Sequence, residues 1–523
     1  LCFGVDERSL FDGTVLRAPA AADLDQLRRA LREARVESVA ICFLHSCQNP
    51  ANERAAAEAL GDCGYLSVSH KVCPEYREYE RASTTAINAY VGPLMDRYLA
   101  RLEGHSISIL QSSGGFMTAG EARRNAVRTV LSGPAGGVVG AMEVARQSGF
   151  RRVLAFDMGG TSTDVSLADG RLRHTLEGSI DTLPLRLPIL DIHTVGAGGG
   201  SIARVDAGGL LRVGPESAGA IPGPACYGTG DRPTVTDAHV VLGRIAEAQF
   251  LGGEMAIDPR RSEAAIDRIA AELQLGRVAA AEGIIRVANA NMERAIRVPS
   301  VERGHDPRDF ALLAFGGCGG LHACDIAAGL GITTVIVPRL AGALSALGML
   351  LADRVRDYSV SALGRPKPEA LYRELERTAR RDLPGARLER SADLRYAGQS
   401  YELTVAWRPP NIAAPFHREH LRVYGYSDRK RAVELVTLRV RAVIPTAKPR
   451  LAGSTARESA SEPDTRRVRI DGQWRTIPAL SRDQIPKRGI KGPALVIDYG
   501  STTLAPAGWR IALDRIGSLI VRR

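Results

Sequence analysis

Hydrophobic residues in the first part of the chain occur in short, mostly continuous runs that alternate with longer stretches of helical spacing. Val36–Leu44 is a run of the kind that forms a buried strand, and it lies between amphipathic stretches over 22–35 and 50–60. A longer helix is predicted from Ser83 to Leu102. This alternation of strand and helix patterns predicts an α/β protein with layered packing.

The middle of the chain contains further strand patterns. Val153–Phe156 and Val165–Ala168 follow each other closely enough to predict a hairpin. Strands are also predicted at 310–315 and 333–338, with a helix over 279–302. Two glycine-rich segments, 112–115 and 132–137, are predicted to be turns, and the second leads into a helix that ends near residue 147.

The pattern changes after residue 357. A predicted helix over 369–381 precedes strands at 392–396, 400–407 and 434–443. Residues 445–467 are rich in Pro, Ser and Ala, which predicts a flexible linker. Short strand patterns fill the rest of the chain, so we expect a mostly β C-terminal domain.

Composition limits the possible functions. A chain of 523 residues predicts two to four domains. The formal charge is +11, but Arg is spread along the chain without interleaved aromatic residues, which favours a solvated surface over nucleic-acid binding. No apolar run approaches the roughly 20 residues of a membrane helix. The eight cysteines have no metal-binding spacing, which predicts a reducing compartment such as the cytoplasm.

The loop of the predicted hairpin carries the sharpest chemical signal. Its two glycines allow backbone N–H groups to approach an anion closely, and its hydroxyl side chains add donors. Asp157 and Asp164 flank the loop and can hold Mg²⁺ directly or through water. The alternative is a plain β-hairpin, in which Asp, Gly and Thr are common. The candidate phosphate-binding residues are Asp157, Gly159, Gly160, Thr161, Ser162 and Thr163.

A second strand also runs into two glycines. Leu312–Phe315 is followed by Gly316 and Gly317, which repeats the geometry of the first loop. Paired loops of this type fit a nucleotide clamped between two lobes, with the phosphates on the first loop and the adenosine facing the second. No GxxxxGK[ST] motif occurs, so the sequence does not support a P-loop NTPase.

Other polar residues near glycines are weaker candidates. Asp191 and His193 precede the glycine run 196–200, and on one face of a strand they could position or deprotonate a nucleophile. The alternative for His193 is a hydrogen-bonded structural histidine. We interpret His322 as a structural residue near the second loop, and Asp237 as a helix cap in preference to a metal ligand.

These loops and further segments resemble the hydantoinase A/5-oxoprolinase family, which includes N-methylhydantoinase A and acetone carboxylase β subunits. The resemblance covers nearly the whole chain in the right order. Its other segments are Glu78–Arg81, Thr84–Tyr90, Ser132–Gly137, His193–Ser201, Gly223–Gly228, Pro233–Ala238, Leu321–Ala323, Leu344–Gly348, Tyr396–Tyr401 and Gly492–Ala494.

The resemblance implies an α/β, two-lobed ATPase fold of the actin/Hsp70/sugar-kinase type. It implies the rest of an N-terminal hydantoinase/oxoprolinase lobe over 1–75, a hydantoinase A-type ATPase core over 76–356 and a β-rich C-terminal domain over 365–523. It also implies ATP and Mg²⁺ as cofactors, with Gly316 and Gly317 at the adenosine and with Asp191 and His193 on the substrate side.

The implied reaction is ATP-dependent hydrolysis of a cyclic amide, such as a hydantoin or 5-oxoproline, through phosphorylation of the amide oxygen. A hydantoinase B-type partner subunit is implied, and no nucleic-acid or membrane partner is expected. Three alternatives stay open, namely an ATP-dependent ketone carboxylase subunit, a sugar or acetate kinase, and a non-catalytic, nucleotide-gated assembly subunit.

The chain departs from the family pattern at three places. A first Asp-x-Gly-Gly-Thr hairpin near the N-terminus is absent, so we expect the chain, which starts at Leu1, to be N-terminally truncated. The second loop reads Gly317-Cys318-Gly319-Gly320 in place of Gly-Ala-Gly-Pro. The segment 228–232 is shorter or less glycine-rich than its family counterpart.

Overall fold

The chain forms two compact units, each assembled from separate segments. The computed structural model describes residues 1–102, 104–245, 252–365, 367–451 and 463–523. Unit 1 contains residues 1–133, 174–190 and 352–447, and unit 2 contains residues 134–173, 191–351 and 448–523. The fold is mixed α/β, as the alternation of strand and helix patterns predicts. The three-part division along the chain stays a prediction.

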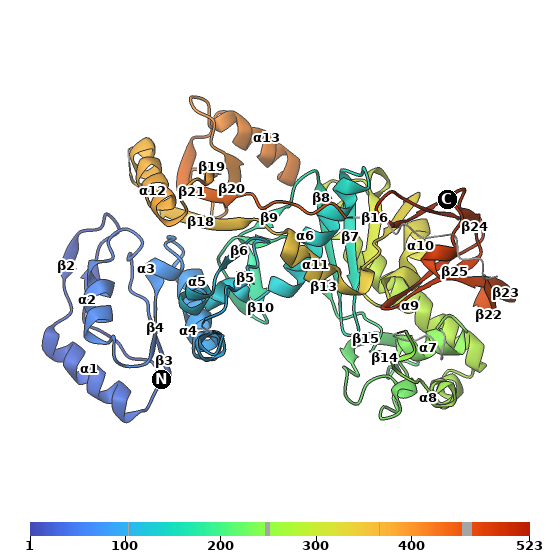
Figure 1. The fold of residues 1–523 in the computed structure, drawn as a ribbon. Helices are drawn as coiled ribbons and strands as arrows, with labels where there is room; N and C mark the ends of the chain where they lie inside the picture. The colour runs from blue at the N-terminus through green and yellow to red at the C-terminus, as the bar shows by residue number, and fades with distance from the viewer. Residues whose placement is uncertain (103, 246–251, 366, 452–462) are drawn as a thin grey trace. The chain divides into compact units, whose positions relative to one another are not determined.

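An eight-stranded sheet forms the centre of unit 2 (Figure 1). Its middle strands run parallel to each other, and the pairs outside them are antiparallel. The middle strands are almost continuous apolar runs because both faces of the sheet are covered. In spatial order the strands are β13 (His193–Val195), β8 (Thr163–Asp169), β7 (Arg152–Met158), β16 (Ala311–Phe315), β17 (Thr334–Val337), β28 (Leu519–Arg522), β27 (Arg510–Leu513) and β24 (Ile490–Lys491).

Helices cover this sheet. Helix α9 (Arg277–Arg297) packs on β8 and β13, and α10 (Gly319–Gly329) packs on β7, β16 and β17. Two further helices, α7 (Val235–Val241) and α8 (Pro259–Glu272), pack against each other, and both also pack against α9. The structure therefore confirms the strands and the helix predicted for this part of the chain, with boundary shifts of a few residues. The predicted strands lie at 153–156, 165–168, 310–315 and 333–338, and the predicted helix at 279–302.

The predicted turn at 132–137 is wrong, because these residues open helix α6 (Ser132–Gln147). The glycines there serve close packing. A Cβ on Gly140 would lie 2.7 Å from the carbonyl oxygen of Leu344, at the start of α11 (Leu344–Leu351), and one on Gly348 would collide with the backbone of Gly136. Small residues in α6 and α11 thus let the two helix backbones approach each other.

The C-terminal strands do not form one domain of their own. Strands β24, β27 and β28 complete the main sheet of unit 2, and β22 (Asp464–Ile470), β23 (Gln473–Leu480), β25 (Ala494–Asp498) and β26 (Ser501–Ala505) form a second sheet there. The predicted linker lies partly outside the described residues, at 452–462. The prediction of a linker is wrong for its last residues, 464–467, because they belong to β22 and pair with β23.

Unit 1 contains a six-stranded sheet and a smaller α/β layer. The smaller layer pairs β3 (Ser38–Ile41) with β4 (Tyr65–Val68) in parallel, beside α1 (Ala21–Glu33) and α2 (Ala51–Ala59). Helix α4 (Glu78–Ala100) begins five residues before its predicted start, and two glutamates occupy its first turn, where the helix dipole favours them. The large sheet has the order β20 (Leu403–Ala406), β19 (Arg387–Tyr396), β21 (Val433–Ile444), β18 (Arg354–Ser361), β6 (Phe116–Thr118) and β5 (Ser108–Leu110).

A network of buried ion pairs joins the three segments of unit 1. Arg439 contacts Glu75 at 2.7 Å and Asp393 at 2.6 Å, and Arg186 contacts Glu75 at 2.9 Å and also pairs with Glu402. Burial alone would raise the pKa of the Glu75 carboxyl, but the charges of Arg439 and Arg186 outweigh it and hold this pKa at about 2. Every carboxylate of the network therefore has an arginine beside it.

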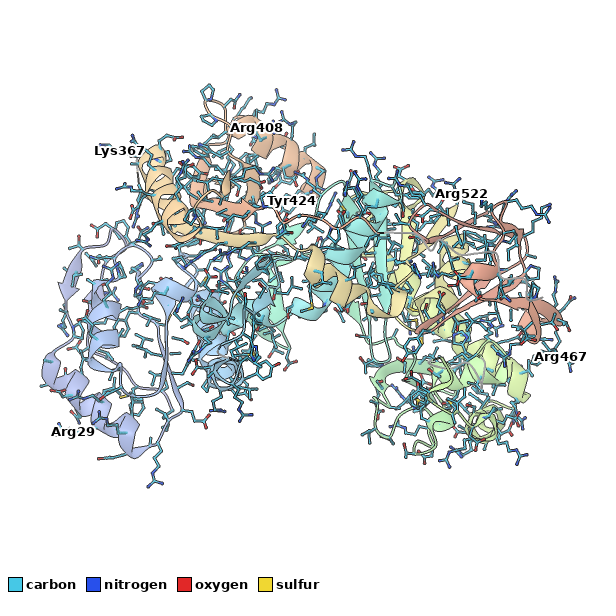
Figure 2. All side chains as sticks on the ribbon, viewed as in Figure 1. Arg29, Lys367, Arg408, Tyr424, Arg467 and Arg522 are labelled. Atoms are coloured by element: carbon cyan, nitrogen blue, oxygen red, sulfur yellow. The ribbon has the colours of Figure 1, made fainter. Side chains whose placement is uncertain are left out.

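Positive charge is spread over the surface, as the sequence predicts. The exposed side chains of Arg29, Arg408, Arg467 and Arg522, labelled in Figure 2, come from different parts of the fold. Within the described ranges, no helix is both long and apolar enough to cross a membrane.

Candidate functional site

The predicted hairpin is formed by β7 and β8. Their antiparallel register places Asp157 opposite Asp164 and Met158 opposite Thr163. The Gly159 N–H donates to the Ser162 carbonyl at 3.1 Å and closes the turn. Directly opposed residues of two strands lie on the same face of the sheet, so the two predicted magnesium ligands come together.

The tip of this hairpin carries unpaired backbone donors. Gly160 and Thr161 are exposed to solvent. Among the residues that the structure describes, the N–H groups of Gly160, Thr161 and Ser162 donate no hydrogen bond. A Cβ on Gly160 would meet no atom within 4 Å, so space is open beside the backbone. Consecutive free N–H groups at a turn form a concave surface that suits a phosphate.

The glycine run after β13 holds the back of this turn. The N–H of Gly199 donates to the Gly159 carbonyl at 3.0 Å, and that of Gly200 donates to the Gly160 carbonyl at 2.6 Å. A Cβ on Gly198 would lie 2.8 Å from the Ser162 nitrogen. The run is therefore a support beneath the loop, and its glycines are required because no side chain fits between the two backbones.

The two facing carboxylates lack a neighbouring cation. Burial, and then the Asp164 carboxylate, raise the pKa of Asp157 to about 7. Burial also raises the pKa of Asp164, against a 2.5 Å hydrogen bond from the Thr194 hydroxyl. In the described ranges, no hydrogen bond or ion pair reaches the Asp157 carboxylate. Two half-buried carboxylates without a counter-charge form a set of ligands that suits a hard divalent cation.

Mg²⁺ fits this pair of carboxylates when phosphate oxygens and water complete its shell. Mg²⁺ is usually held by one or two carboxylates and keeps several water ligands. Nowhere in the described part of the chain do three or more His, Cys, Asp or Glu side chains gather as a metal site. The arrangement therefore favours a cation that arrives with a phosphate over a permanently bound structural metal.

The second glycine loop lies against the first. Strand β16 is parallel to β7 and pairs Phe315 with Asp157, so both loops leave the same edge of the sheet. A Cβ on Gly316 would lie 2.5 Å from the Asp157 Oδ1 atom, and the Cys318 N–H donates to the Met158 carbonyl at 3.3 Å. Gly316 is thus packed beside Asp157, whereas a Cβ on Gly317 would meet no atom closer than 3.7 Å. Their role in adenosine binding stays a prediction.

Thr163 has a different place from the other loop hydroxyls. Its buried side chain donates to the Ala197 carbonyl and fastens the hairpin to the glycine run. Thr161 and Ser162 remain at the surface of the turn. Sequence reasoning missed Thr194, which contacts Asp164, although this threonine belongs to the glycine-run segment that carried the family resemblance.

Asp191 and His193 lie at the edge of the same sheet. Asp191 is buried and forms an ion pair with Arg303. His193 begins β13, where it is paired with Val165, while Thr194 is paired with Asp164. Side chains alternate along a strand, so His193 is on the face opposite Asp164. Their predicted catalytic roles stay predictions, and Asp191 already has a charged partner.

The helices behind the loops are fixed by buried polar contacts. Thr234 is the N-cap of α7, and Asp237 completes a capping box from the third helical position. Asp237 thus helps to cap this helix, but the prediction that it is the N-cap residue itself is wrong. His322 of α10 contacts His239 at 2.9 Å between Nε2 atoms and Asn289 at 2.6 Å. Burial lowers the pKa of His322 to about 3, so the ring is neutral, as a structural residue would be.

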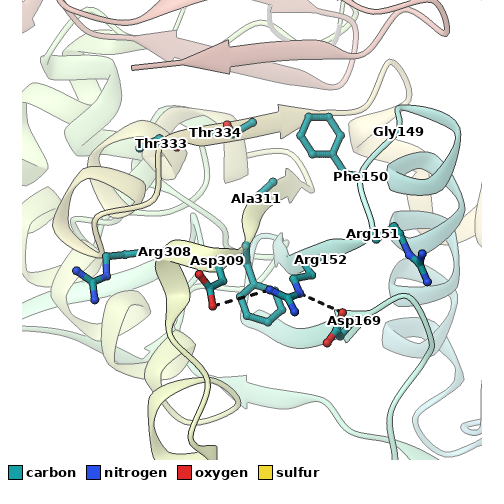
Figure 3. A pocket seen from close by; sticks show the side chains of 11 residues that line it. Gly149, Phe150, Arg151, Arg152, Asp169, Arg308, Asp309, Ala311, Thr333 and Thr334 are labelled. Carbon is teal, nitrogen blue, oxygen red and sulfur yellow. Dashed lines mark hydrogen bonds and ion pairs between the residues drawn. The ribbon is translucent and has the colours of Figure 1, made fainter.

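A hollow of about 700 Å³ lies at the other end of these strands, near the start of β7 and β16. Figure 3 shows Arg152 between Asp169 and Asp309, with nitrogen–oxygen distances of 3.3 and 3.9 Å. Both aspartates that line this hollow therefore have an arginine beside them, unlike the two at the hairpin.

The site is therefore a hairpin turn with free N–H groups and two facing carboxylates without a counter-charge, on the mixed sheet of unit 2. A family model described as hydantoinase/oxoprolinase matches residues 81–358, and one described as the hydantoinase/oxoprolinase N-terminal region matches residues 1–64. The chain belongs to the hydantoinase/oxoprolinase family, which confirms the family prediction.

Relatives of the chain include enzymes that differ in substrate. The caprolactamase α subunit of Pseudomonas jessenii is 34% identical over 92% of this chain and 76% of its own length. The crystal structure of the ATP-dependent caprolactamase from that organism matches with a TM-score of 0.87 at 33% identity, covering 99% of this chain and 81% of that chain. The 5-oxoprolinase of Saccharomyces cerevisiae is 31% identical over 94% of this chain and 42% of its own length.

A structure of acetone carboxylase without nucleotide is a further match. Its TM-score is 0.78 at 26% identity, and the alignment covers 99% of this chain and 81% of that chain. The same fold is thus found in relatives named for hydrolysis and in one named for carboxylation.

Proposed function

We propose that the chain is the ATP-binding subunit or half of an enzyme that hydrolyses a cyclic amide of the hydantoin or 5-oxoproline type. The observation that carries the proposal is the facing pair of Asp157 and Asp164 beside a turn with free N–H groups. The relatives named caprolactamase and 5-oxoprolinase support the substrate class, since caprolactam and 5-oxoproline are both cyclic amides.

The chemistry requires activation of the amide. An amide oxygen is a poor leaving group, and transfer of the γ-phosphoryl group of ATP to it replaces the P–O bond to ADP by a new P–O bond to the amide oxygen. Water then adds to the ring carbon more readily, and the C–N bond breaks as the nitrogen takes up a proton, which opens the ring to an acyl phosphate. A second water attacks the carbonyl carbon of this acyl phosphate, and phosphate leaves with the former amide oxygen to give the carboxylate. Positioning and charge stabilisation account for most catalysis of such transfers.

This chain contributes phosphate binding to that reaction. The N–H groups of Gly160, Thr161 and Ser162 would contact phosphate oxygens, and the hydroxyls of Thr161 and Ser162 would add donors. Asp157 and Asp164 would hold Mg²⁺, directly or through water, which supplies the positive charge that the phosphates require. Gly317 offers the more open backbone of the second loop and would face adenosine.

Three broader predictions belong to this proposal. Unit 2 would be one lobe of an actin/Hsp70/sugar-kinase-like ATPase fold. A hydantoinase B-type subunit would complete the enzyme, as the name caprolactamase subunit alpha suggests for that relative. The cytoplasm would be its compartment, which agrees with eight cysteines that are all free.

The test compares two aspartates of one strand pair. Asp157→Asn should weaken MgATP binding at least about tenfold, whereas Asp169→Asn, at the other end of β8, should leave it unchanged. Because Asp157 is partly protonated near pH 7, MgATP binding should release a proton, which calorimetry in buffers of different ionisation enthalpy measures. Equal MgATP affinity in both variants would refute the hairpin assignment.

A second candidate is an ATP-dependent ketone carboxylase, favoured by the match to acetone carboxylase. Turnover by the full-length protein with its partner subunit separates the candidates. ADP release stimulated by hydantoin or 5-oxoproline supports the amide hydrolase, and release that needs acetone and bicarbonate supports the carboxylase. Nucleotide binding without stimulated turnover would favour an assembly subunit.

A further inference from the structure

Unit 1 contains a small cavity that the proposed reaction does not use. Its volume is about 170 Å³, and its walls come from β18, the helix α5 (Ala119–Arg124), the short helix at 126–129 and α12 (Pro368–Asp382). All the lining residues belong to unit 1. The charged ones are Lys71, Glu121, Arg128, Arg356 and Asp357.

The carboxylates of this cavity already have partners. Glu121 accepts a 2.7 Å hydrogen bond from Arg356, and both oxygens of Asp357 accept hydrogen bonds from Arg441, at 2.8 and 3.1 Å. Arg356 also contacts Asp382 at 3.2 Å. These contacts leave no carboxylate bonded to the remaining cations.

Arg128 and Lys71 are those remaining cations. For the side chains of both, the described part of the chain provides no ion pair and no hydrogen bond. Lys71 is exposed, whereas Arg128 is partly buried. Burial lowers the pKa of the Arg128 guanidinium although nearby Asp357 acts to raise it. A charge that is partly removed from water gains when a counter-charge replaces the lost solvent, and no bonded carboxylate does so for Arg128.

We infer that this cavity binds a small oxyanion, a carboxylate or a phosphate group, through the guanidinium of Arg128. The planar fork of arginine donors matches two oxygens of such a group, and Lys71 adds a second positive charge at the mouth. The hollow of Figure 3 carries no such inference, because there Arg152 is already paired with two aspartates. This inference is independent of the proposed nucleotide site, which lies in unit 2.

The test measures the thermal unfolding of the full chain in sodium chloride, phosphate and acetate at one ionic strength. Phosphate or acetate should raise the unfolding midpoint by about 2 °C or more over chloride. Arg128→Gln should abolish the rise in acetate and reduce the rise in phosphate, since phosphate can also bind the hairpin of unit 2. The larger reduction identifies the oxyanion that the cavity prefers. Arg97→Gln, which changes an exposed arginine of α4, should retain both rises.

A second readout separates an anion site from a structural arginine. If Arg128 lacks a partner, Arg128→Gln should not lower the midpoint in chloride, whereas loss of a structural ion pair would lower it by several degrees. Arg128→Lys keeps the charge but loses the fork, so it should fold and show most of the rise removed. A rise in acetate and phosphate that Arg128→Gln leaves unchanged, no rise in the unmodified protein, or a lower midpoint in chloride for Arg128→Gln would each overturn the inference.

Discussion

The hairpin of unit 2 and the ion-pair network of unit 1 both remove carboxylates from water, but their neighbours differ. In unit 1, Glu75 lies between Arg186 and Arg439, and its pKa falls to about 2. In unit 2, Asp157 faces Asp164 without a cation, and its pKa rises to about 7. Burial acts in the same direction on both, so the arginines decide the sign of the shift.

This difference separates a structural role from a binding role. A carboxylate that already has its counter-charge has little to gain from an added cation, and it contributes to the fold. A carboxylate pair without one destabilises the unliganded protein and is relieved by a cation that arrives with the ligand. The network therefore stabilises unit 1, whereas the hairpin has the charge arrangement that the proposed MgATP site requires.

The largest expected effect is on the network. Arg439→Leu leaves Asp393 without its arginine and Glu75 with Arg186 alone, so we expect unit 1 to lose about 3–5 kcal/mol of unfolding free energy. Urea denaturation measures this loss. The control is Arg387→Leu on the same strand pair, whose exposed contact with Glu389 should be worth less than about 1 kcal/mol. Equal losses in the two variants would contradict the structural role of the network.

An intermediate effect is expected from the glycines around the hairpin. Gly199→Ala places a Cβ 2.7 Å from the Cys318 sulfur and 2.9 Å from the Thr236 hydroxyl, so it should destabilise unit 2 by about 1–3 kcal/mol. Adding Cys318→Ala should restore part of that loss. Gly160→Ala meets no atom and should leave stability unchanged while it weakens MgATP binding.

Denaturation together with nucleotide titration distinguishes these glycines. If Gly199→Ala and Gly160→Ala changed unfolding free energy and MgATP affinity in the same proportion, the two glycines would not have different roles. The distinction between a glycine run that supports the hairpin and a turn that binds the nucleotide would then be wrong.

The smallest effect, taken per pH unit, is on the pH dependence of stability. Asp157 has a folded pKa above its usual value of 3.8, so its contribution is fully present below that value and is lost as the pH rises to about 7. Relative to the unmodified protein, the unfolding free energy of Asp157→Asn should increase by up to about 1 kcal/mol per pH unit as the pH rises over this range. Asp169→Asn should show no such gain.

The contribution of Glu75 to the unfolding free energy should change with pH in the opposite direction. Its folded pKa lies below the usual 4.5, so its contribution is present above that value and is lost as the pH falls toward about 2. Denaturation curves from pH 2 to pH 8 measure both slopes. Slopes of the same sign at Asp157 and Glu75 would show that the two regions do not differ as proposed.

Much of the hairpin could be predicted from the sequence because its determinants are local. A strand, two glycines, three hydroxyl residues and a second strand specify the turn within 157–164, and β7 and β8 form there. The turn predicted at 132–137 failed because glycine was taken as a signal of chain reversal. In α6 it serves close helix packing, which depends on the distant Leu344 and Gly348.

The environment of the candidate site residues could not be predicted in the same way. Asp191 was a candidate base on local grounds, yet Arg303 neutralises it from more than a hundred residues away. Thr163 belonged to the predicted phosphate-binding set, yet its hydroxyl is directed to Ala197. Such contacts depend on which strands and loops become neighbours, and chain spacing does not specify this.

The sequence by itself determined the family, the α/β character and the loop of Asp157–Asp164, since each depends on residues that are close together or on motifs in a fixed order. Only the tertiary structure decided which charges are compensated. Glu75 meets arginines from two other segments, Asp157 meets a second aspartate, and Arg128 meets no bonded partner among the described residues. The electrostatic state of a buried group depends on its neighbours in space, and these come from distant parts of the chain.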